Sequence, residues 1–315
     1  ELTPFCREMF VGRRSGQPAD HYEILETLGQ GSFGIVKKVL CKTSRAPRVL
    51  KSVDKNAAMK SGMHPQMVME EIDKLKALDH PAVLRLFEYY ADTNALHLIT
   101  DHLPGGELAK IVEESHKKGS PLAEAWVRKT FQQVCEGIAY CHGKGVMHRD
   151  LKLENVMLGT MDPPEAIIID VGLAELFPAA LGDNHRSKNG TGSIQTMAPE
   201  VFRHSSTYKC DVWSLGCCLF GMVCKRPLWI PSRGGGMEIY PYPFAPPQDM
   251  SQPQLQQYIR RQQGGPDLMN TWCSPCTAQR FGARQLIHRM LTFNEQARPN
   301  MRNVLPHPWL RAEAD

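Results

Sequence analysis

The spacing of apolar residues changes once along this chain, at Pro104-Gly105-Gly106. Before that point, short runs rich in β-branched and aromatic residues alternate with turns, which predicts strands. The predicted strands are 22–28, 35–40, 48–53, 83–89 and 96–100, with one helix at 65–78. After it, helical spacing dominates, and the first long helix is predicted to begin at Ser120-Pro121. The pattern predicts an α+β fold, with a β-rich N-terminal lobe and a mostly helical C-terminal lobe.

The composition is that of a globular protein, because 42% of the 315 residues are hydrophobic and 22% are charged. The net charge of +4 is not concentrated in one basic run, so we expect no nucleic-acid partner. The longest nearly apolar stretch, 212–224, is too short to cross a bilayer, so we expect no transmembrane segment. The ten cysteines are scattered, which favours reduced thiols and a cytoplasmic location. Cys273-Ser-Pro-Cys276 has no second CxxC pair and is interpreted as a loop rather than a zinc site.

Gly29, Gly31 and Gly34 fit the pattern GxGxxG, which alone is a weak signal. A dinucleotide-binding oxidoreductase shares the pattern but needs a helix directly after the glycines. Here residues 35–40 predict a strand instead, so we reject that alternative. The glycines then predict a β-hairpin whose backbone closely approaches bound phosphates.

Lys51 lies on the next predicted strand, where a buried lysine can hold the α- and β-phosphates if a carboxylate pairs with it. The predicted helix at 65–78 offers Glu70 and Glu71. Glu71 has Leu75 four residues on and shares the apolar face of the helix, whereas Glu70 has Lys74 there. We therefore predict the pair Lys51–Glu71.

The run His148-Arg-Asp150-Leu-Lys152-Leu-Glu-Asn155 is the most specific signal in the chain. Asp150 is predicted to accept the proton of a substrate hydroxyl, and Lys152 to neutralise charge on a transferring phosphoryl group. Asn155 is predicted to bind Mg²⁺. Asp170 follows a predicted strand at 166–169 and is predicted to hold a metal ion that bridges the phosphates.

These motifs together resemble those of eukaryotic protein kinases over about residues 22–310. HRDLKxxN is similar to the serine/threonine type. Further similarities to the family are Ala198-Pro-Glu200, Asp211-Val-Trp-Ser-Leu-Gly216 and Arg298, the expected partner of Glu200. Those to the calcium/calmodulin-dependent and calcium-dependent kinases are His307-Pro-Trp309, Gly105-Gly-Glu107-Leu and His80-Pro81.

The resemblance implies a bilobal kinase fold with ATP and Mg²⁺ as cofactors and proteins as substrates. It places an N-terminal extension at 1–20, the N-lobe at 21–101, the C-lobe at 102–310 and a tail at 311–315. The activation segment would span 170–200. The chain begins at Glu1 and resembles a fragment, which we expect to be a monomer. Whether a lipid anchor lies upstream of Glu1 stays an open question.

The resemblance also implies residue roles. The expected ATP contacts are Gly29, Gly31, Gly34, Val36, Val49, Lys51, Asp101, Leu103, Glu107 and Met157. Substrate contacts are expected from Glu107, Glu154 and Ser193, with Glu107 and Glu154 as an acidic pair that accepts an arginine three residues before the phosphorylated Ser or Thr. Ser187 and Thr191 are candidate phosphorylation sites whose phosphate Arg149 would bind.

The chain departs from the family pattern at Val171, Val49 and Ser193, where Phe, Ala and Thr are usual. Val171 should fill less of a hydrophobic column, which would leave the active arrangement less populated. The alternative function is therefore a weakly active kinase or a pseudokinase that acts as a binding scaffold.

The segment 231–253 is rich in proline and glycine and predicts a long surface loop. It also carries Tyr240, Tyr242 and Phe244. One interpretation is a docking site for a partner, and the other is a loop whose aromatic side chains are buried against its own lobe.

Overall fold

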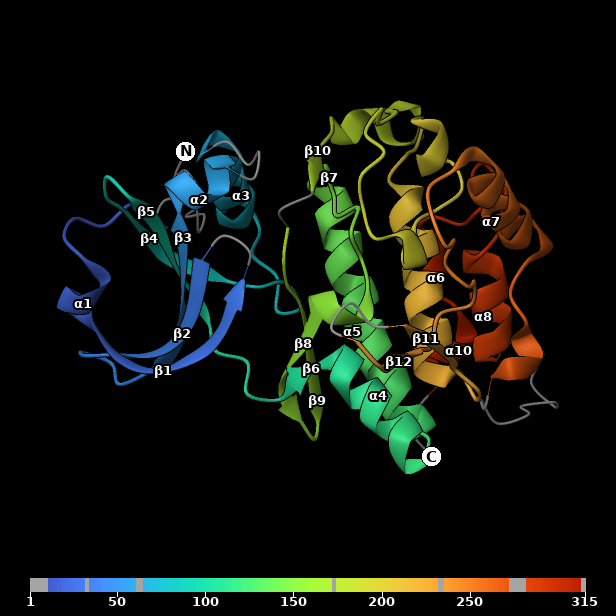
Figure 1. Cartoon of the computed structure of the whole chain (residues 1–315), viewed down its shortest axis with the longest axis horizontal. Helices are drawn as coiled ribbons and strands as arrows, with labels where there is room; N and C mark the ends of the chain where they lie inside the picture. The colour runs from blue at the N-terminus through green and yellow to red at the C-terminus, as the bar shows by residue number, and fades with distance from the viewer. Residues whose placement is uncertain are drawn as a thin grey trace, which may run out of the picture. The chain divides into compact units, whose positions relative to one another are not determined.

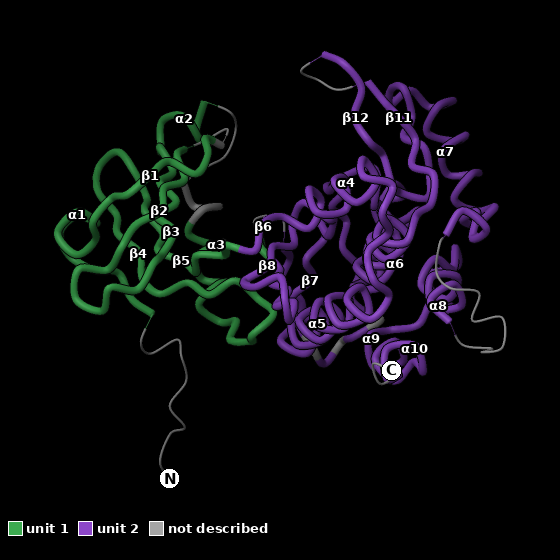
Figure 2. Tube along the Cα trace, turned by 90° about the horizontal axis from the view of Figure 1, so that it is seen from below, with its two compact units in different colours: residues 1–104, 169–172 green, residues 105–168, 173–315 purple. Residues whose placement is uncertain are grey.

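The structure is a computed structural model that describes residues 11–31, 34–60, 65–171, 174–231, 235–271 and 282–312. Its contacts divide the chain into two compact units, coloured separately in Figure 2. The first unit holds residues 1–104 and 169–172, and the second holds 105–168 and 173–315. The division after Pro104 coincides with the change in apolar spacing. Residues 169–172, which include Asp170, belong to the first unit, although the residues on either side of them belong to the second.

Within the described part of the first unit, five antiparallel strands form a sheet in the order β1-β2-β3-β5-β4 (Figure 1). They are β1 Tyr22–Gly31, β2 Gly34–Cys41, β3 Pro47–Asp54, β4 Leu86–Ala91 and β5 Ala95–Asp101. The helices are α1 Pro18–His21, α2 Lys55–Lys60 and α3 Pro65–Ala77. The predicted strands and helix are confirmed, except that β4 begins at Leu86 because residues 80–83 form a turn, with Val83 N donating to His80 O at 3.0 Å.

The core of this sheet lies on one face, where Tyr22, Val39, Leu50, Tyr90 and Ile99 are buried together. Side chains alternate between the two faces of a strand, so residues next to these in sequence point to the other face.

Residues before α1 also belong to the first unit. Arg14 N donates to Tyr89 O at 2.8 Å, and Tyr89 N donates to Gly12 O at 3.3 Å. The Arg14 guanidinium lies 2.9 Å from Glu88 Oε2. This short segment therefore covers the open edge of β4, which would otherwise present unpaired backbone groups.

The second unit is mainly helical. Its helices are α4 Leu108–Lys118, α5 Glu124–Gly143, α6 Lys209–Val223, α7 Gln252–Gly264, α8 Ala283–Met290, α9 Met301–Val304 and α10 Pro308–Arg311. Its strands are β6 Gly106–Glu107, β7 Val146–Met147, β8 Val156–Met161, β9 Pro164–Ile168, β10 Glu175–Leu176, β11 Leu228–Pro231 and β12 Met237–Tyr240. Short 3-10 helices are η2 Leu153–Asn155, η3 Ala179–Asn184, η4 Ile194–Thr196, η5 Val201–Arg203 and η6 Leu268–Asn270. Over the described ranges, no helix has the length and apolar character needed to cross a membrane. The predicted α+β fold, with a β-rich first unit and a mostly helical second unit, is confirmed.

The start predicted for the first long helix at Ser120 is wrong. Helix α5 begins at Glu124, with Ala123 as its N-cap. Gly119 ends α4 in the left-handed conformation, and Ser120 N donates to Ser115 O at 3.1 Å. Ser120 therefore belongs to the C-terminal turn of α4, a use of serine that the capping pattern does not distinguish.

The core of the second unit is built around α6, in which every residue is buried. Figure 1 shows α6 between α5 and α8. The predicted buried face of α5 is confirmed at Val127, Phe131, Val134 and Ile138.

The prediction of one irregular surface loop at 231–253 is wrong in part. Strand β12 lies within it and pairs with β11, which ends at Pro231, and α7 begins at Gln252. Tyr240, Tyr242 and Phe244 are 5%, 7% and 3% exposed, and the Phe244 ring stacks on Trp213 of α6 at 5.6 Å. The three aromatic side chains fill the core of their own unit. The structure therefore supports the interpretation in which they are buried against their own lobe.

Candidate active site

Asp150 lies at the centre of a polar cluster in the second unit, between the end of β7 and η2. Its Oδ1 accepts a hydrogen bond from Ser193 N at 2.8 Å. Its Oδ2 lies 3.1 Å from Asn155 Nδ2 and 3.0 Å from Lys152 Nζ. Lys152 Nζ also donates to Ser193 Oγ at 2.9 Å. Predicted catalytic, metal-binding and substrate-binding residues of this unit therefore meet at one carboxylate.

The cluster is fixed but not sealed from solvent. Asp150 is 8% exposed, and the Lys152 side chain is 22% exposed. Asn155 is buried and also donates from Nδ2 to Asp150 O at 2.8 Å, which locks the turn between the two residues. The carboxylate thus has one orientation while a route to solvent remains.

Asp211 at the start of α6 holds the backbone of this loop. Its carboxylate accepts from His148 N at 2.9 Å, from Arg149 N at 2.8 Å and from His142 Nε2 at 2.8 Å. Burial would raise the pKa of Asp211, but the hydrogen bond and charge of His142 and the bonds from the loop outweigh it, so the pKa is lowered. The sequence motif contained Asp211 but did not indicate its partners. An acid directly before the apolar run 212–224 was the available signal.

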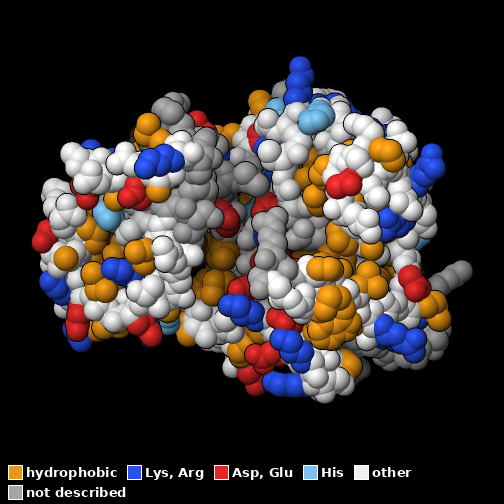
Figure 3. Space-filling view, viewed as in Figure 1, with side chains coloured by type: hydrophobic (Ala, Val, Ile, Leu, Met, Phe, Trp, Pro, Cys, Tyr) orange, Lys and Arg blue, Asp and Glu red, His pale blue; other side chains and the backbone are white. Residues whose placement is uncertain are grey.

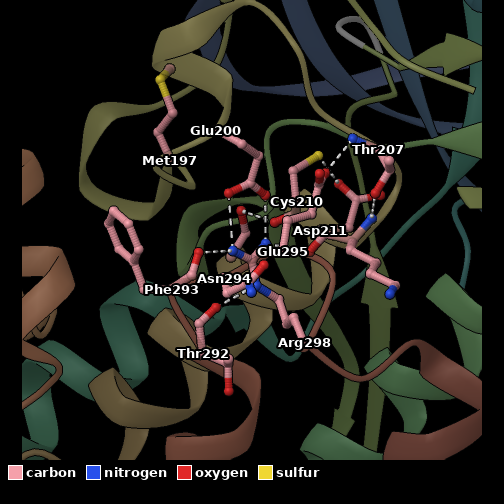
Figure 4. A network of polar contacts seen from close by, with 12 residues as sticks. Met197, Glu200, Thr207, Cys210, Asp211, Thr292, Phe293, Asn294, Glu295 and Arg298 are labelled. Atoms are coloured by element: carbon pink, nitrogen blue, oxygen red, sulfur yellow. Dashed lines mark hydrogen bonds and ion pairs between the residues drawn. The ribbon is translucent and has the colours of Figure 1, made fainter.

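Arg298 and Glu200 form the pair that the resemblance implied (Figure 4). The guanidinium of Arg298 donates to Glu200 Oε1 at 2.5 Å and to Oε2 at 3.0 Å. It also donates to the carbonyl oxygens of Lys209 and Thr292, each at 3.0 Å. Such a buried bidentate pair ties Glu200, where the predicted activation segment ends, to the helical core.

Glu107 and Glu154, the predicted substrate-binding acids, line one pocket of about 370 Å³ in the second unit. Glu107 Oε2 lies 3.3 Å from Lys110 Nζ. Glu154 Oε2 accepts from the Tyr242 hydroxyl at 2.8 Å, and that hydroxyl accepts from Leu153 N at 3.1 Å. Burial, followed by the Glu154 carboxylate, raises the pKa of Tyr242, so the phenol stays protonated and donates. Sequence reasoning missed Tyr242 because the contact crosses 88 residues.

The glycine motif lies on the hairpin of β1 and β2, where Gly31 pairs with Gly34 and Gly29 with Val36. The predicted absence of a helix after the glycines is therefore confirmed in residues 34–41. A Cβ on Gly34 would lie 1.7 Å from Ser52 O of β3, so a side chain there would separate the strands. A Cβ on Gly29 would meet nothing within 4 Å, which leaves its backbone open to a ligand.

Other predicted ATP contacts share one face of the first unit's sheet. Val36 of β2 is the cross-strand partner of Lys51 of β3, and Val49 is that of Thr100 of β5. Cross-strand partners lie on the same face, and Val49 and Lys51 are two residues apart, so they share it too. The sheet thus presents a lysine beside small apolar side chains.

The remaining predicted contacts divide between the units. Asp101 ends β5, and its Oδ2 accepts from Arg85 N at 3.2 Å, while Leu103 is buried two residues later. In the second unit, Glu107 of β6 is the cross-strand partner of Met157 of β8. The Glu71 side chain lies outside the described residues, although its backbone is part of α3. The pair Lys51–Glu71 stays a prediction.

Asp170 adopts a left-handed backbone conformation with φ of 62°, and Val171 is 2% exposed. Val171 is therefore a core residue despite its smaller size. Among the described residues, no group of three or more His, Cys, Asp and Glu side chains could hold a metal ion. Because Asp170 and Asn155 belong to different units, their joint metal site stays a prediction.

The candidate phosphorylation sites differ in exposure. Ser187 is 1% exposed, and its backbone pairs with that of Ser206. Thr191 is exposed, and its Oγ1 accepts from Arg149 Nη2 at 2.6 Å.

Comparisons with known proteins agree with these observations. The model of the family described as protein kinase domain matches residues 22–310. Serine/threonine-protein kinase PLK4 of Drosophila virilis is 28% identical over 303 residues, which cover 96% of this chain and 34% of that protein. Calcium-dependent protein kinase 5 of Plasmodium falciparum is 30% identical over 299 residues, which cover 93% and 46%. CBL-interacting protein kinase 1 of Oryza sativa subsp. japonica is 31% identical over 294 residues, which cover 93% and 56%.

The chain spans less than two thirds of the length of each of these relatives. The matches include calcium-dependent kinases, so the resemblance to serine/threonine kinases of that kind is confirmed. With its motifs, its fold and the matched residues in agreement, the chain belongs to the protein kinase family.

Proposed function

We propose that this chain transfers the γ-phosphoryl group of ATP to serine or threonine hydroxyls of proteins. The observation that carries the proposal is the cluster in which Asp150 contacts Lys152, Asn155 and Ser193 N. Such a cluster suits phosphoryl transfer, where catalysis consists mostly of positioning and charge stabilisation.

Asp150 would orient the substrate hydroxyl and accept its proton on a carboxylate oxygen. Lys152 Nζ, which lies 3.0 Å from Asp150 Oδ2 and 2.9 Å from Ser193 Oγ, would neutralise charge on the transferring group. Ser193 N holds Oδ1 of the same carboxylate, so the segment that would bind substrate also orients the base. Lys51 and the glycine hairpin would bind the phosphates.

The donor atoms of Asn155 and Asp170 fit Mg²⁺, which prefers oxygen ligands. Asn155 makes its hydrogen bonds to Asp150 from Nδ2, which leaves the amide oxygen for a cation. Asp170 would supply a carboxylate. When bound, Mg²⁺ would neutralise charge on the phosphates. Asn155 and Asp170 would hold it, and Asp150 would remain the group that receives the proton.

The test compares Asp150→Asn with Asp162→Asn, a control on an exposed turn. We expect Asp150→Asn to lower kcat on a basic peptide by at least about a hundredfold, since the proton acceptor is lost. Mg·ATP should still raise the melting temperature, and Asp162→Asn should behave as wild type. Near-wild-type turnover by Asp150→Asn would contradict the proposal. Stabilisation of wild type by Mg·ATP without any transfer would instead favour the scaffold alternative. That alternative rests on Val171, a buried residue that is smaller than the usual Phe.

We further propose that substrates carry an arginine three residues before the phosphorylated residue. The shared pocket of Glu107 and Glu154 supports this. The Lys110 side chain beside Glu107 is 73% exposed, and such surface pairs contribute only about 0–1 kcal/mol, so a substrate guanidinium would displace it readily. Tyr242 fixes the orientation of Glu154, and an arginine fork can bond two carboxylates at once.

Glu113 of α4 and Glu238 of β12 also line this pocket. Figure 3 shows acidic and basic side chains intermingled over α4, where Lys117 pairs with Glu113 and Lys118 with Glu114. Glu238 is exposed and lies on the hairpin within 228–240, so this segment contributes an acid to the proposed arginine site.

A positional peptide library would test the substrate preference. For wild type we expect a discrimination of roughly 1–3 kcal/mol in favour of arginine at that position. The double substitution Glu107→Gln/Glu154→Gln should abolish this preference, and Glu238→Gln should weaken it. Glu114→Gln on the same helix is the matched control and should leave the preference intact. Indifference of wild type to basic residues at that position would contradict the proposal.

A further inference from the structure

Helix α7 buries two polar side chains, those of Tyr258 and Gln262, which lie one turn apart on the same face of the helix. They are 0% and 1% exposed, whereas Gln263 next to them is exposed. Burial raises the pKa of the Tyr258 phenol above its usual value, and a hydrogen bond with Gln262 lowers it in part. The two side chains therefore form one buried polar pair in which the phenol stays protonated.

Both side chains of this pair donate to backbone carbonyl oxygens in the segment 193–197. The Tyr258 hydroxyl donates to Ile194 O at 2.8 Å. Gln262 Nε2 donates to Met197 O, also at 2.8 Å. Each contact crosses more than sixty residues of chain, since the two bonds span 64 and 65 positions. One helix thus holds two carbonyl oxygens of a short segment that is distant in sequence.

The segment that α7 holds leads directly to the catalytic carboxylate. Ser193 precedes η4, and Thr196 N donates back to Ser193 O at 3.1 Å, which closes the turn. Thr196 O accepts from Ser214 Oγ of α6 at 2.8 Å. At the other end of the turn, Ser193 N donates to Asp150 Oδ1 at 2.8 Å. A single hydrogen-bonded turn therefore connects α7 to the group that would accept the substrate proton.

Gln262 lowers stability at its position because only part of its amide is used. Its Oε1 is buried and has no hydrogen-bond partner among the described residues. A buried polar atom without a partner destabilises the folded state, and an apolar side chain of similar length, such as methionine, would avoid that loss. What methionine could not do is donate to Met197 O and to the Tyr258 hydroxyl. The contribution specific to Gln262 is therefore its hold on the turn.

We propose that Tyr258 and Gln262 are positioning residues for phosphoryl transfer, which hold the turn 193–197 so that the amide of Ser193 orients the carboxylate of Asp150. This role rests on the proposed kinase function. Neither side chain touches Asp150, so both act through the backbone between them. In Gln262, stability is exchanged for turnover, as happens where a functional arrangement requires a polar group in a core.

The experiment compares Gln262→Met with Gln263→Met, a matched control on the exposed side of the same helix. We expect Gln262→Met to lower kcat on a basic peptide by about three- to tenfold, the effect of one lost hydrogen bond on the turn. KM for ATP should change by less than about twofold, because the nucleotide site is not disturbed. The melting temperature should not fall, since the unpaired Oε1 is removed. Gln263→Met should match wild type in all three measurements.

The combination of lower kcat with undiminished stability distinguishes positioning from a merely structural role. If Gln262 only supported the fold, kcat and the melting temperature would fall together, and that result would overturn the inference. So would a Gln262→Met variant as active as Gln263→Met. In both cases the proposed function would stand, because wild type still transfers phosphate. Absence of transfer by wild type would overturn both.

The second arm uses Tyr258→Phe, which removes only the hydroxyl. Because both side chains hold one turn, the loss of kcat in the double variant Tyr258→Phe/Gln262→Met should be smaller than the product of the single losses. Hydrogen exchange in protein without nucleotide gives a readout that does not depend on activity. The amides of 193–197 should exchange faster in each single variant than in Gln263→Met. Exchange rates equal to those of the control, or losses of kcat that multiply, would contradict the proposed coupling.

Discussion

The backbone amide of Ser193 and the carboxylate of Asp150 are joined at 2.8 Å, whereas the Ser193 hydroxyl contacts Lys152 instead. The two contacts are made by different atoms of one residue. A serine in place of the usual threonine therefore keeps both of them, since neither uses the threonine methyl group.

Ser193→Ala should remove only the contact with Lys152. We expect kcat to fall by about two- to tenfold, which corresponds to the roughly 0.5–1.5 kcal/mol of one hydrogen bond. Ser193→Thr keeps the hydroxyl and should match wild type in the same peptide assay. An alanine variant with unchanged kcat would mean that Lys152 does not need this partner.

The aromatic residues of 228–244 should fall into two groups on mutation. Phe244 is 3% exposed against Trp213, so Phe244→Ala should lower the free energy of unfolding by about 3–5 kcal/mol. Trp229 of β11 is 56% exposed, and Trp229→Ala should change it by less than about 0.5 kcal/mol. Urea denaturation of the two variants is the measurement, and equal effects would contradict the burial that separates them.

Acid should weaken the second unit through Asp211. The folded-state pKa of this buried carboxyl is lowered below its usual value of 3.8, so its contribution to stability is fully present above pH 3.8. That contribution is lost as pH falls from there through the lower folded pKa. The unfolding free energy of wild type should therefore drop more steeply below about pH 4 than that of Asp211→Asn, which should be less stable at pH 7. Parallel pH curves from urea titrations would refute this.

The described cysteines should react unequally with iodoacetamide. Burial raises the pKa of Cys141 to about 12 and of Cys224 to about 11, and it also raises those of Cys135, Cys210, Cys217 and Cys218. Cys41 is only partly buried, and hydrogen bonds from Ser44 lower its pKa. Because the thiolate is the reactive form, peptide mapping at neutral pH should find Cys41 alkylated first among these residues. Cys41→Ser should remove that early product without speeding the others.

Sequence patterns predicted those parts of the fold that depend on residues close together in the chain. The strands and α3 follow from periodicity, and the cluster at 150–155 follows from a fixed short spacing. Even a short-range pattern can mislead. Gly119 ends α4 in the left-handed conformation, so Ser120 belongs to the end of that helix and not to the start of the next one.

Contacts between distant segments could not be predicted in the same way. The bond of Tyr242 with Glu154 and that of Glu175 with Arg149 depend on how the chain packs, and no spacing in the sequence encodes either distance. The prolines and glycines of 231–253 correctly excluded one regular element, but they could not reveal that Tyr240, Tyr242 and Phe244 complete the core.

Helix α6 has no side that faces solvent. Its amide hydrogens can exchange with deuterium only when the packing around it opens, so they should be among the slowest in the second unit. Asp211, in the first turn of that helix, holds the backbone amides of His148 and Arg149. The loop that carries Asp150 is thus anchored to a helix that opens rarely. The amide hydrogens of His148 and Arg149 should therefore exchange about as slowly as those of α6.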